Sequence, residues 1–222
     1  MAEGNRVLTD ELLECVWRAG LILLGNQVRQ EYGLATPIFI DLRHRLYEDV
    51  ALVGALGRAL HRKVSEVAGD GRAPQQVIGI PDTATPLALA AAMASLATPR
   101  PLLYAQLRKR PAAYPGGKSG VSAFMGTWQP GREVTLIDDV MASGRSKLWA
   151  IEELAKDSIP VARVLVVVDR QQGGDEILAA RGYRTYSLYT IGQVLDYYVV
   201  TGKVEAPVAR DALDYLRAKQ FR

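Results

Sequence analysis

Two adjacent carboxylates, Asp138 and Asp139, follow an apolar run in the stretch Val134-Thr-Leu-Ile-Asp-Asp-Val-Met-Ala-Ser-Gly-Arg-Ser146. The run predicts a buried strand, and the small residues after it predict a turn into a helix that begins near Arg145 or Ser146. Ligands of open α/β sheets bind beyond the carboxyl ends of the strands. A turn of Ala, Ser and Gly before a helix lets backbone N–H groups surround a phosphate at the positive end of the helix dipole.

The neighbouring groups define what else this site can hold. The hydroxyls of Ser143 and Ser146 can donate to the same phosphate. The carboxylates would repel it, so their partner must be sugar hydroxyls or a Mg²⁺ held with them. No G-x-x-x-x-G-K-[ST] leads from a strand into a helix, and no G-x-G-x-x-G follows a strand, which argues against a P-loop nucleotidase and a dinucleotide-binding fold. We therefore expect a phosphate group beside a ribose.

Residues 108–120 concentrate positive charge. They include Arg108, Lys109, Arg110 and Lys118, together with two prolines and three glycines. Such a segment cannot continue a helix or a central strand, so it predicts a long mobile loop. An isolated basic loop is usually a solvated surface hairpin, but next to a phosphate site it becomes a candidate clamp.

Alternating elements would position both segments. The patterns predict helices at 49–67, 87–96, 147–156, 191–200 and 208–219, and strands at 36–41, 76–80, 102–107, 134–137, 164–168 and 183–189. A further helix is expected from Leu8 to Ile22 or Leu23, with Thr9 or Asp10 as its cap and Gly33 stopping the segment after it. Strands that are apolar on both faces indicate an α/β fold with a largely parallel central sheet flanked by helices. We expect one domain, with a helical N-terminal lobe at 1–35 and the main part at 36–222.

Composition excludes several other classes of protein. Of the 222 residues, 49% are hydrophobic, and 27 Lys+Arg against 24 Asp+Glu leave a formal charge of +3, so disorder, a collagen and a highly cationic nucleic-acid arm are not predicted. A single cysteine, Cys15, rules out an internal disulfide framework, and with two histidines, His44 and His61, a multi-histidine metal centre is not expected. The apolar stretch 83–99 is shorter than the roughly 20 residues of a spanning helix, so we expect no membrane segment and a cytoplasmic location.

Several motifs together resemble one family. The stretch 134–146 is similar to the phosphoribosyl pyrophosphate signature of type I phosphoribosyltransferases. The orotate phosphoribosyltransferase branch, including the transferase domain of uridine monophosphate synthase, is indicated by Pro37-Ile-Phe-Ile-Asp-Leu-Arg43, Gly79-Ile-Pro-Asp-Thr-Ala-Thr-Pro-Leu-Ala88, Arg108-Lys109 and Val168-Asp-Arg-Gln-Gln-Gly-Gly174. The resemblance runs in order from about residue 37 to 203. It implies transfer of the phosphoribosyl group from phosphoribosyl pyrophosphate to orotate, giving orotidine 5′-monophosphate and pyrophosphate, with Mg²⁺ as cofactor.

The resemblance also implies roles for single residues. Asp138 and Asp139 would hold the ribose 2- and 3-hydroxyls, directly or through water and Mg²⁺, and with Lys109 they would be the catalytic residues. The expected phosphate-binding turn consists of Val140, Met141, Ala142, Ser143, Gly144, Arg145 and Ser146. Contacts to the pyrophosphate would come from Thr83, Arg108 and Lys109, with Tyr114 and Lys118 farther along the loop. Arg170 would pair with the polar edge of the base, and Phe39 and Arg43 would lie over it.

Two departures from the family pattern leave alternatives open. Members usually carry Lys where this sequence has Ala112, and Thr where it has Ala142. The alternatives are a phosphoribosyltransferase for another base, and a non-catalytic phosphoribosyl pyrophosphate-binding paralogue that acts as a regulator. The resemblance further implies a homodimer in which loop 108–120 reaches the neighbouring site, and no nucleic-acid partner is expected. A chain of this length has no room for an added barrel of roughly 250 residues, so any decarboxylase is expected as a separate protein.

Overall fold

The sheet that carries the predicted site is largely parallel. The computed structural model describes residues 3–69, 73–109 and 122–221. Its six-stranded sheet has the order β5-β4-β3-β6-β7-β8, in which every neighbouring pair is parallel except β4 and β5. The strands are β3 (Gln75–Gly79), β4 (Leu103–Leu107), β5 (Phe124–Met125), β6 (Glu133–Met141), β7 (Val161–Asp169) and β8 (Arg184–Thr190). The predicted fold class is confirmed.

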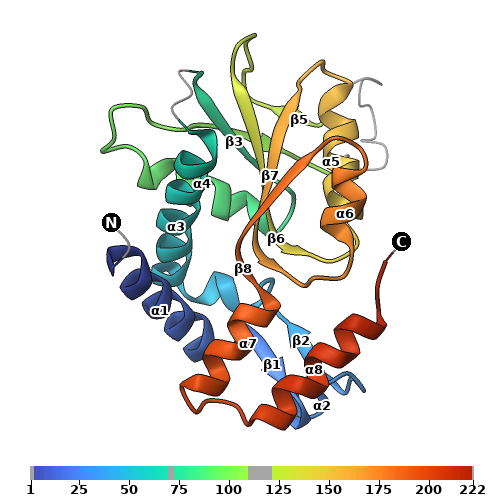
Figure 1. The fold of residues 1–222 in the computed structure, drawn as a ribbon. Helices are drawn as coiled ribbons and strands as arrows, with labels where there is room; N and C mark the ends of the chain where they lie inside the picture. Colours follow the sequence, from blue (N-terminus) through green and yellow to red (C-terminus); the bar gives the residue numbers. More distant parts are fainter. Residues whose placement is uncertain (1–2, 70–72, 110–121, 222) are drawn as a thin grey trace.

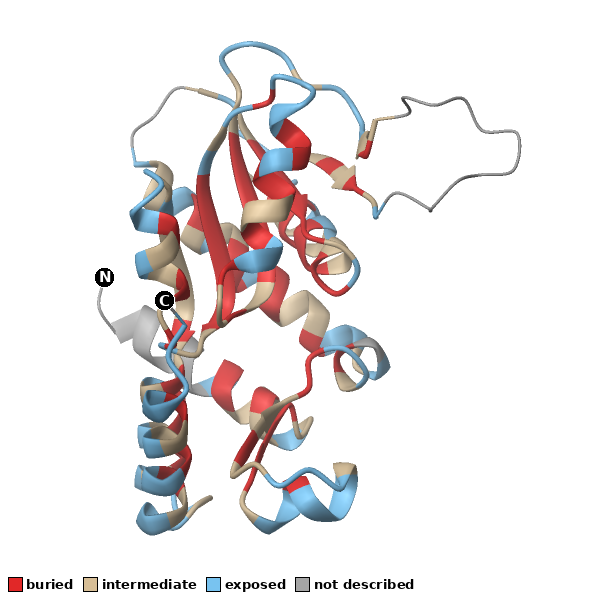
Figure 2. Ribbon diagram, turned by 90° about the vertical axis from the view of Figure 1, so that its right-hand side faces the viewer, coloured by how far each residue is buried: buried red, intermediate tan, exposed pale blue. Residues whose placement is uncertain are grey.

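Helices cover both faces of this sheet (Figure 1). One face is covered by α3 (Val50–Ala68) and α4 (Ala84–Ala94), and the other by α5 (Arg145–Ala155) and α6 (Gly174–Ala179). Successive residues of β7 alternate between the two cores: Val164 and Val166 pack on the α5 side, whereas Leu165 and Val167 pack on the α3 side. The central strands are buried along most of their length (Figure 2). Burial on both faces explains why these strands read as continuous apolar runs.

A second, smaller group of elements lies beside the main sheet, at the bottom of Figure 1. It contains α1 (Glu3–Arg18), β1 (Ile22–Leu24), α2 (Asn26–Tyr32), β2 (Ile38–Ile40), η1 (Arg45–Glu48), α7 (Ile191–Val200) and α8 (Ala206–Ala218). Strands β1 and β2 pair antiparallel, with Leu23 opposite Phe39. They lie on either side of residue 35, and the expected boundary between an N-terminal lobe at 1–35 and a main part at 36–222 stays a prediction.

The first helix differs from the sequence expectation. It ends at Arg18, and the expected helix end at Ile22 or Leu23 lies instead in β1 (Ile22–Leu24). The break comes at Gly20, which adopts a φ of 62° and donates its N–H to the Trp17 carbonyl at 2.9 Å. Glycine takes this left-handed conformation without steric cost, so the helix stops and the apolar run continues as a buried strand. The expected cap at Thr9 or Asp10 was also wrong, because the helix begins at Glu3.

Other expected boundaries are confirmed. Helix α3 begins after Asp49, whose carboxylate accepts the Leu52 N–H at 2.9 Å, and Gly33 ends α2 with a φ of 65°. Helix α7 has the predicted bounds and a capping box made by Thr190 and Gln193. Of the expected loop 108–120, only Arg108 and Lys109 lie within the described residues. In the part of the chain that the structure describes, none of the helices combines the length and apolar character needed to cross a bilayer.

Candidate active site

The carboxyl ends of β3, β6 and β7 meet at one cavity of about 410 Å³. These strands are adjacent and parallel, so the residues that follow them are brought to the same edge of the sheet. Nine of the residues named from the sequence line the cavity: Phe39, Arg43, Thr83, Asp138, Asp139, Val140, Ala142, Ser146 and Arg170. The structure thus brings together residues from four segments that are far apart in the chain.

The turn between β6 and α5 has the form expected of a phosphate-binding turn. Gly144 is the N-cap of α5 and has a φ of 73°, which favours glycine. A Cβ at Gly174, the first residue of α6, would lie 2.4 Å from the Ala142 carbonyl oxygen, so only glycine lets these two segments approach. Because Gly144 has no side chain to cap the helix, the first N–H groups of α5 remain available to an anion.

Asp138 is buried and fully engaged by its own chain. One carboxylate oxygen accepts the Asp139 N–H at 2.9 Å, and the other accepts the Ser146 hydroxyl at 3.1 Å. The second oxygen also lies 2.6 Å from the ammonium group of Lys147. That ammonium group donates to the Val140 carbonyl and lies 3.3 Å from the Ser146 hydroxyl oxygen. Both partners of this ion pair are more than nine-tenths buried, with side-chain exposures of 3% for Lys147 and 7% for Asp138.

Asp139 is the carboxylate with spare hydrogen-bonding capacity. One of its oxygens accepts the Val140 N–H at 2.7 Å, and the side chain lines the cavity. Burial, reinforced by the negative charge of Asp138, raises the pKa of Asp139 to about 7. The positive charge of Lys147 and the bond from Val140 oppose this rise in pKa. A cation or donor hydroxyls placed in the cavity would therefore stabilise the ionised form of Asp139.

Arg170 lines the same cavity and follows the end of β7, the strand next to β6. Its backbone N–H donates to the Met141 carbonyl at 2.9 Å, and the side chain is half-buried. Burial lowers the pKa of the guanidinium, which stays charged at neutral pH. Among the described residues, its buried Nε has no hydrogen-bond partner. An acceptor oxygen on a bound molecule would satisfy that N–H.

The cavity wall next to β2 is built around a second buried carboxylate, Asp41. It accepts a hydrogen bond from the Tyr32 hydroxyl, the Arg43 N–H at 3.2 Å and the His44 N–H at 3.1 Å. The His44 Nδ1 lies 3.2 Å from the same carboxylate, while 79% of the His44 side chain is exposed. Burial alone would raise the pKa of Asp41, but the bonds from Tyr32 and His44 hold it below its usual value. Asp41 thus fixes the path of the chain that presents Phe39 and Arg43 to the cavity.

Two predicted pyrophosphate contacts do not line the cavity. The Lys109 ammonium group lies 2.9 Å from the Asp82 carboxylate, and both side chains are exposed. Arg108 donates its N–H to the Ala123 carbonyl at 3.0 Å, close to β5. The remaining predicted loop residues, Tyr114 and Lys118, lie outside the described residues, as does Ala112.

Comparison with known proteins assigns the chain to a family. No family model matches the sequence. It is 30% identical over 194 residues to the orotate phosphoribosyltransferase of Aeropyrum pernix, which covers 87% of this chain and 96% of that protein. The chain belongs to the orotate phosphoribosyltransferase family. It is also 31% identical over 202 residues to the uridine 5′-monophosphate synthase of Caenorhabditis elegans, spanning 90% of this chain but only 38% of that protein.

A solved structure supports the same assignment. The UMP synthase of Leishmania donovani superposes with a TM-score of 0.72 and 25% sequence identity, over 95% of this chain and 42% of that one. The phosphoribosyltransferase fold expected from the sequence is therefore confirmed.

Six residues that line this orotate phosphoribosyltransferase-family site were not named from the sequence. Besides Asp41, His44, Ile80 and Lys147, the cavity is lined by Ile40 and Pro81, which also had no role assigned from the sequence. Asp41 and His44 flank the predicted Arg43, so proximity to a named residue was an available signal. Lys147 follows the named turn directly, and its position in the first turn of α5 returns its side chain to the carboxylate pair.

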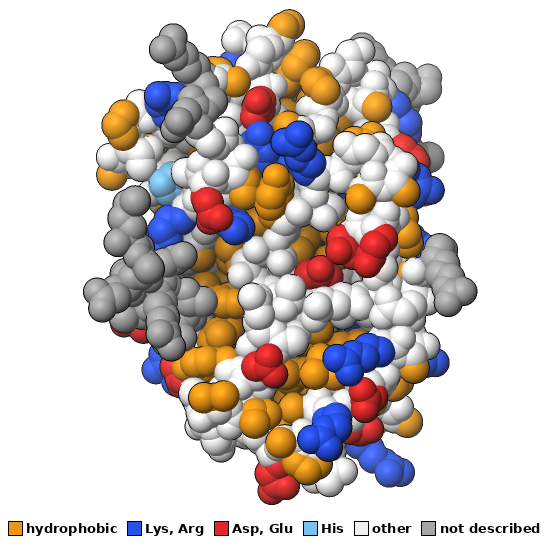
Figure 3. All heavy atoms as spheres, viewed as in Figure 1, with side chains coloured by type: hydrophobic (Ala, Val, Ile, Leu, Met, Phe, Trp, Pro, Cys, Tyr) orange, Lys and Arg blue, Asp and Glu red, His pale blue; other side chains and the backbone are white. Residues whose placement is uncertain are grey.

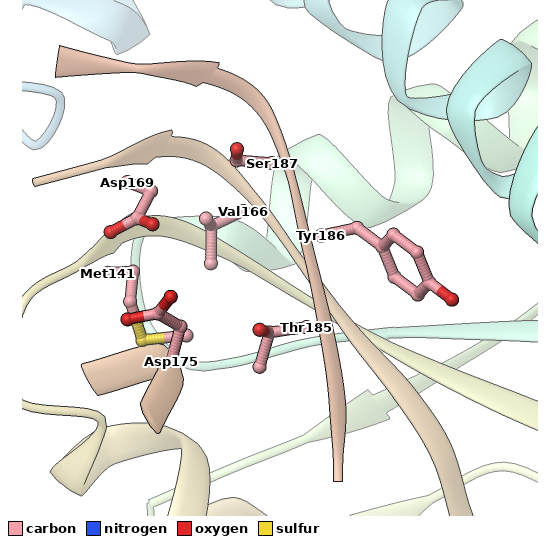
Figure 4. Close-up of a pocket in the computed structure, with 7 residues that line it drawn as sticks. All are labelled: Met141, Val166, Asp169, Asp175, Thr185, Tyr186 and Ser187. Atoms are coloured by element: carbon pink, nitrogen blue, oxygen red, sulfur yellow. The ribbon is translucent and has the colours of Figure 1, made fainter. Parts of the chain in front are cut away.

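Predicted turn residues that do not line the main cavity have other surroundings. Met141 lines a separate, smaller cavity of about 90 Å³ together with Asp169, Asp175 and residues of β8. In Figure 4 the two carboxylates approach the same space beside Met141, and the Tyr186 ring points away from it. Burial raises the pKa of Asp169, with a smaller contribution from the charge of Asp175. Acidic side chains gather over α6 on the surface as well (Figure 3), so this region is unsuited to phosphates.

Proposed function

We propose that this protein transfers the phosphoribosyl group of phosphoribosyl pyrophosphate to orotate, forming orotidine 5′-monophosphate and pyrophosphate in pyrimidine biosynthesis. The observation that carries the proposal is the single cavity in which the β6–α5 turn, the Asp138–Asp139 pair and Arg170 meet. Membership of the orotate phosphoribosyltransferase family supports it.

The β6–α5 side of the cavity is assigned to the sugar phosphate. The open N-terminus of α5 and the turn before it bind the 5′-phosphate, with the Ser143 hydroxyl as a further donor, whereas the single O–H of Ser146 is donated to Asp138. Asp139 accepts hydrogen bonds from the ribose hydroxyls, since it has an oxygen left for them. This arrangement holds the sugar by both ends, which orients its anomeric carbon toward the rest of the cavity.

The reaction breaks the bond from the anomeric carbon to a pyrophosphate oxygen and forms a bond from that carbon to a ring nitrogen of orotate, which loses its proton. Positive charge grows on the ribose and negative charge on the leaving group as the bond breaks. The carboxylate of Asp139 stabilises the positive charge on the ribose. Lys109 and Arg108 neutralise the negative charge on the leaving pyrophosphate, and the Thr83 hydroxyl donates a hydrogen bond to it. Lys109 must turn from Asp82 to do so, which an exposed ion pair permits at small cost. Tyr114 and Lys118 stay predicted contacts on the same loop.

The base is assigned to the wall formed by Phe39, Arg43 and Arg170. Arg170 supplies guanidinium N–H groups to the polar edge of orotate, including the Nε that lacks a partner within the described residues. The Phe39 ring, held against Tyr32 with 4.6 Å between ring centroids, supplies an apolar surface for the flat base.

Mg²⁺ is proposed as the cofactor, carried mainly by the substrate. Within the described residues there is no group of three or more His, Cys, Asp or Glu side chains that could hold a metal. A donor set of one available carboxylate, Asp139, fits Mg²⁺ well, because this ion keeps several waters and usually binds through one or two carboxylates and substrate phosphates. When bound, it would supply charge neutralisation at the pyrophosphate.

We further propose a homodimer. On α4 and just after it, Leu89, Met93 and Leu96 are exposed at spacings of four and three residues, which places them on one apolar face. Sedimentation equilibrium at micromolar concentration measures the mass, and a monomer there would contradict the dimer. A separate decarboxylase that consumes the product and a cytoplasmic location stay predictions.

The test of the function is loss of orotate absorbance with purified protein, Mg²⁺ and phosphoribosyl pyrophosphate. We expect turnover with orotate and none with uracil, the matched base that lacks a carboxylate for Arg170. Turnover of another base without orotate turnover would refute the substrate. If no base reacts while calorimetry shows binding of phosphoribosyl pyrophosphate, the protein is a regulator. Ala112 and Ala142, which replace the usual Lys and Thr, would then explain the lack of catalysis.

A further inference from the structure

A buried ammonium group stands directly behind the carboxylate pair of the cavity. Lys147 is 3% exposed, although lysine is among the residues that are almost never fully buried without a partner. Taking two charges out of water is costly, and replacing a buried ion pair by apolar residues is often neutral or stabilising. A buried lysine at this place is therefore weak evidence for a role in stability.

The contacts of Lys147 separate the two carboxylates into different roles. Its ammonium group has three partners: the Asp138 carboxylate at 2.6 Å, the Val140 carbonyl, and the Ser146 hydroxyl oxygen at 3.3 Å. An ammonium group has three N–H donors, so this set uses all of them. Asp138 accepts from donors of the chain on both oxygens, whereas Asp139 accepts from one donor among the described residues, the Val140 N–H, and its carboxyl otherwise meets the Asp138 carboxylate.

We propose that Lys147 is the resident cation of the sugar-phosphate site, taking at Asp138 the place that a divalent cation would otherwise take at a carboxylate pair. Asp139 alone then meets the ribose hydroxyls and any metal that arrives with the pyrophosphate. That the ligand is phosphoribosyl pyrophosphate rests on the proposed function, whereas the position of the Lys147 ammonium group beside Asp138 does not.

The charge count gives the reason for such an arrangement. Without Lys147, the strand end would place two negative charges beside the turn that receives a phosphate, and each would repel the incoming anion. With Lys147, the three groups sum to one negative charge when Asp139 is ionised and to zero when it is protonated. A buried ammonium group such as that of Lys147 is screened less by water and salt than an exposed one, so it acts more strongly on a ligand beside it. The protein therefore needs less help from added metal to accept a phosphorylated sugar.

The experiment measures the affinity for phosphoribosyl pyrophosphate by calorimetry, once in EDTA and once in Mg²⁺. The wild-type affinity should change by less than about 5-fold between the two conditions. For Lys147→Met, which has a similar length and no charge, we expect a loss of at least about 30-fold in EDTA, since truncating one partner of a buried charge pair leaves the other uncompensated. Mg²⁺ should recover most of this loss. Equal Mg²⁺ dependence in the wild type and Lys147→Met would overturn the proposal.

Two further variants control the result. Lys156→Met, at the far end of α5 where the side chain is exposed and paired with Glu153, should leave both affinities unchanged. Because Lys147→Met alone leaves a buried carboxylate unpaired and can destabilise the fold, the double variant Lys147→Met/Asp138→Asn is measured beside it. The double variant should fold and show the small Mg²⁺ dependence of the wild type, since no uncompensated charge remains. Loss of its binding in both conditions would mean that Asp138 meets the ligand itself, which overturns the proposal.

Failure of this inference is distinguishable from failure of the proposed function. Wild-type binding of phosphoribosyl pyrophosphate without orotate turnover refutes the proposed reaction while the calorimetric comparison still supports or overturns the role of Lys147. Orotate turnover by the wild type, combined with equal Mg²⁺ dependence of binding in the wild type and Lys147→Met, supports the proposed reaction and overturns the role of Lys147.

Discussion

The two sides of the cavity are built in different ways. The side proposed for the sugar phosphate comes from one continuous stretch, residues 138–147, in which buried side chains and backbone bond one another. The side proposed for the base is assembled from β2 and the end of β7, and its residues include the largely exposed His44 and the half-buried Arg170. The first is pre-organised before any ligand binds, whereas the second keeps unsatisfied or exposed groups that a ligand must order.

This difference follows from where each side sits on the fold. Strand β6 has parallel neighbours on both edges and is buried at residues 134–138, so the turn that follows it has a fixed position. Strand β2 belongs to a two-stranded sheet with a single partner, β1. A two-stranded sheet is only marginally stable by itself, so its position depends on packing against the rest of the chain. We therefore expect substitutions on the first side to remove binding of the sugar phosphate, and those on the second to change the preference for the base.

The largest effect is expected on the sugar-phosphate side. Asp139→Asn keeps the size of the side chain but removes the negative charge that we propose stabilises the ribose as pyrophosphate leaves. We expect kcat/KM to fall by about 100-fold or more, the usual loss when one pre-organised electrostatic contact is removed. Steady-state kinetics with orotate and phosphoribosyl pyrophosphate measure it. Asp214→Asn, an exposed residue of α8, is the matched control and should be unchanged; full activity of Asp139→Asn would remove Asp139 from the site.

A smaller and more selective effect is expected on the base side. Arg170→Ala removes the guanidinium proposed to bind the base, so the KM for orotate should rise by about 10- to 100-fold, as for the loss of a charged hydrogen bond. The KM for phosphoribosyl pyrophosphate should change by less than about 3-fold, because the turn and α5 are untouched. Arg217→Ala, an exposed arginine of α8, serves as the control. If the KM values for both substrates rise together, Arg170 does not divide the cavity as proposed.

The same contrast decides how much could be predicted from the sequence. The stretch 134–146 contains its strand, turn and helix start together, so local pattern was enough to place Asp138, Asp139 and the turn at Gly144. The buried strands were found because apolar residues fill both faces of the sheet. Strand β5, with two residues, and β1, which continues an apolar helical pattern past Gly20, carry too little local signal to be recognised.

Residues that depend on tertiary contacts were harder to find. Lys147 lies on an amphipathic helix, where a lysine is ordinarily assigned to the solvent face, and only the fold shows that it turns inward to Asp138. Asp41 acquires its role from Tyr32 and His44, which reach it from α2 and from the segment before η1. No periodic pattern in the sequence predicts the contacts of Lys147 or of Asp41. Sequence motifs of the family supplied Phe39 and Arg170, whose types and spacing alone did not imply a base site.

The smallest effect concerns stability and would sharpen the idea that the sugar-phosphate side is held under electrostatic strain. The folded protein raises the pKa of Asp139 to about 7 from 3.8. Between these values the unfolded chain has released the proton that the folded chain still binds, so ionisation of Asp139 destabilises the fold progressively as pH rises and has its full effect above about pH 7. Asp139→Asn removes that penalty and should be more stable than the wild type at pH 8.

The advantage of Asp139→Asn should shrink on acidification, because Asp139 itself becomes protonated in the folded state. A difference of 1 in pKa corresponds to about 1.4 kcal/mol, so we expect the gain in unfolding free energy to be about 1 to 3 kcal/mol larger at pH 8 than at pH 5. Urea denaturation of both proteins at the two pH values measures it, and a pH-independent difference would contradict it. A variant that is more stable and yet inactive would show that the carboxylate pair is kept for its ligand, and that Lys147 offsets only part of the cost of holding it.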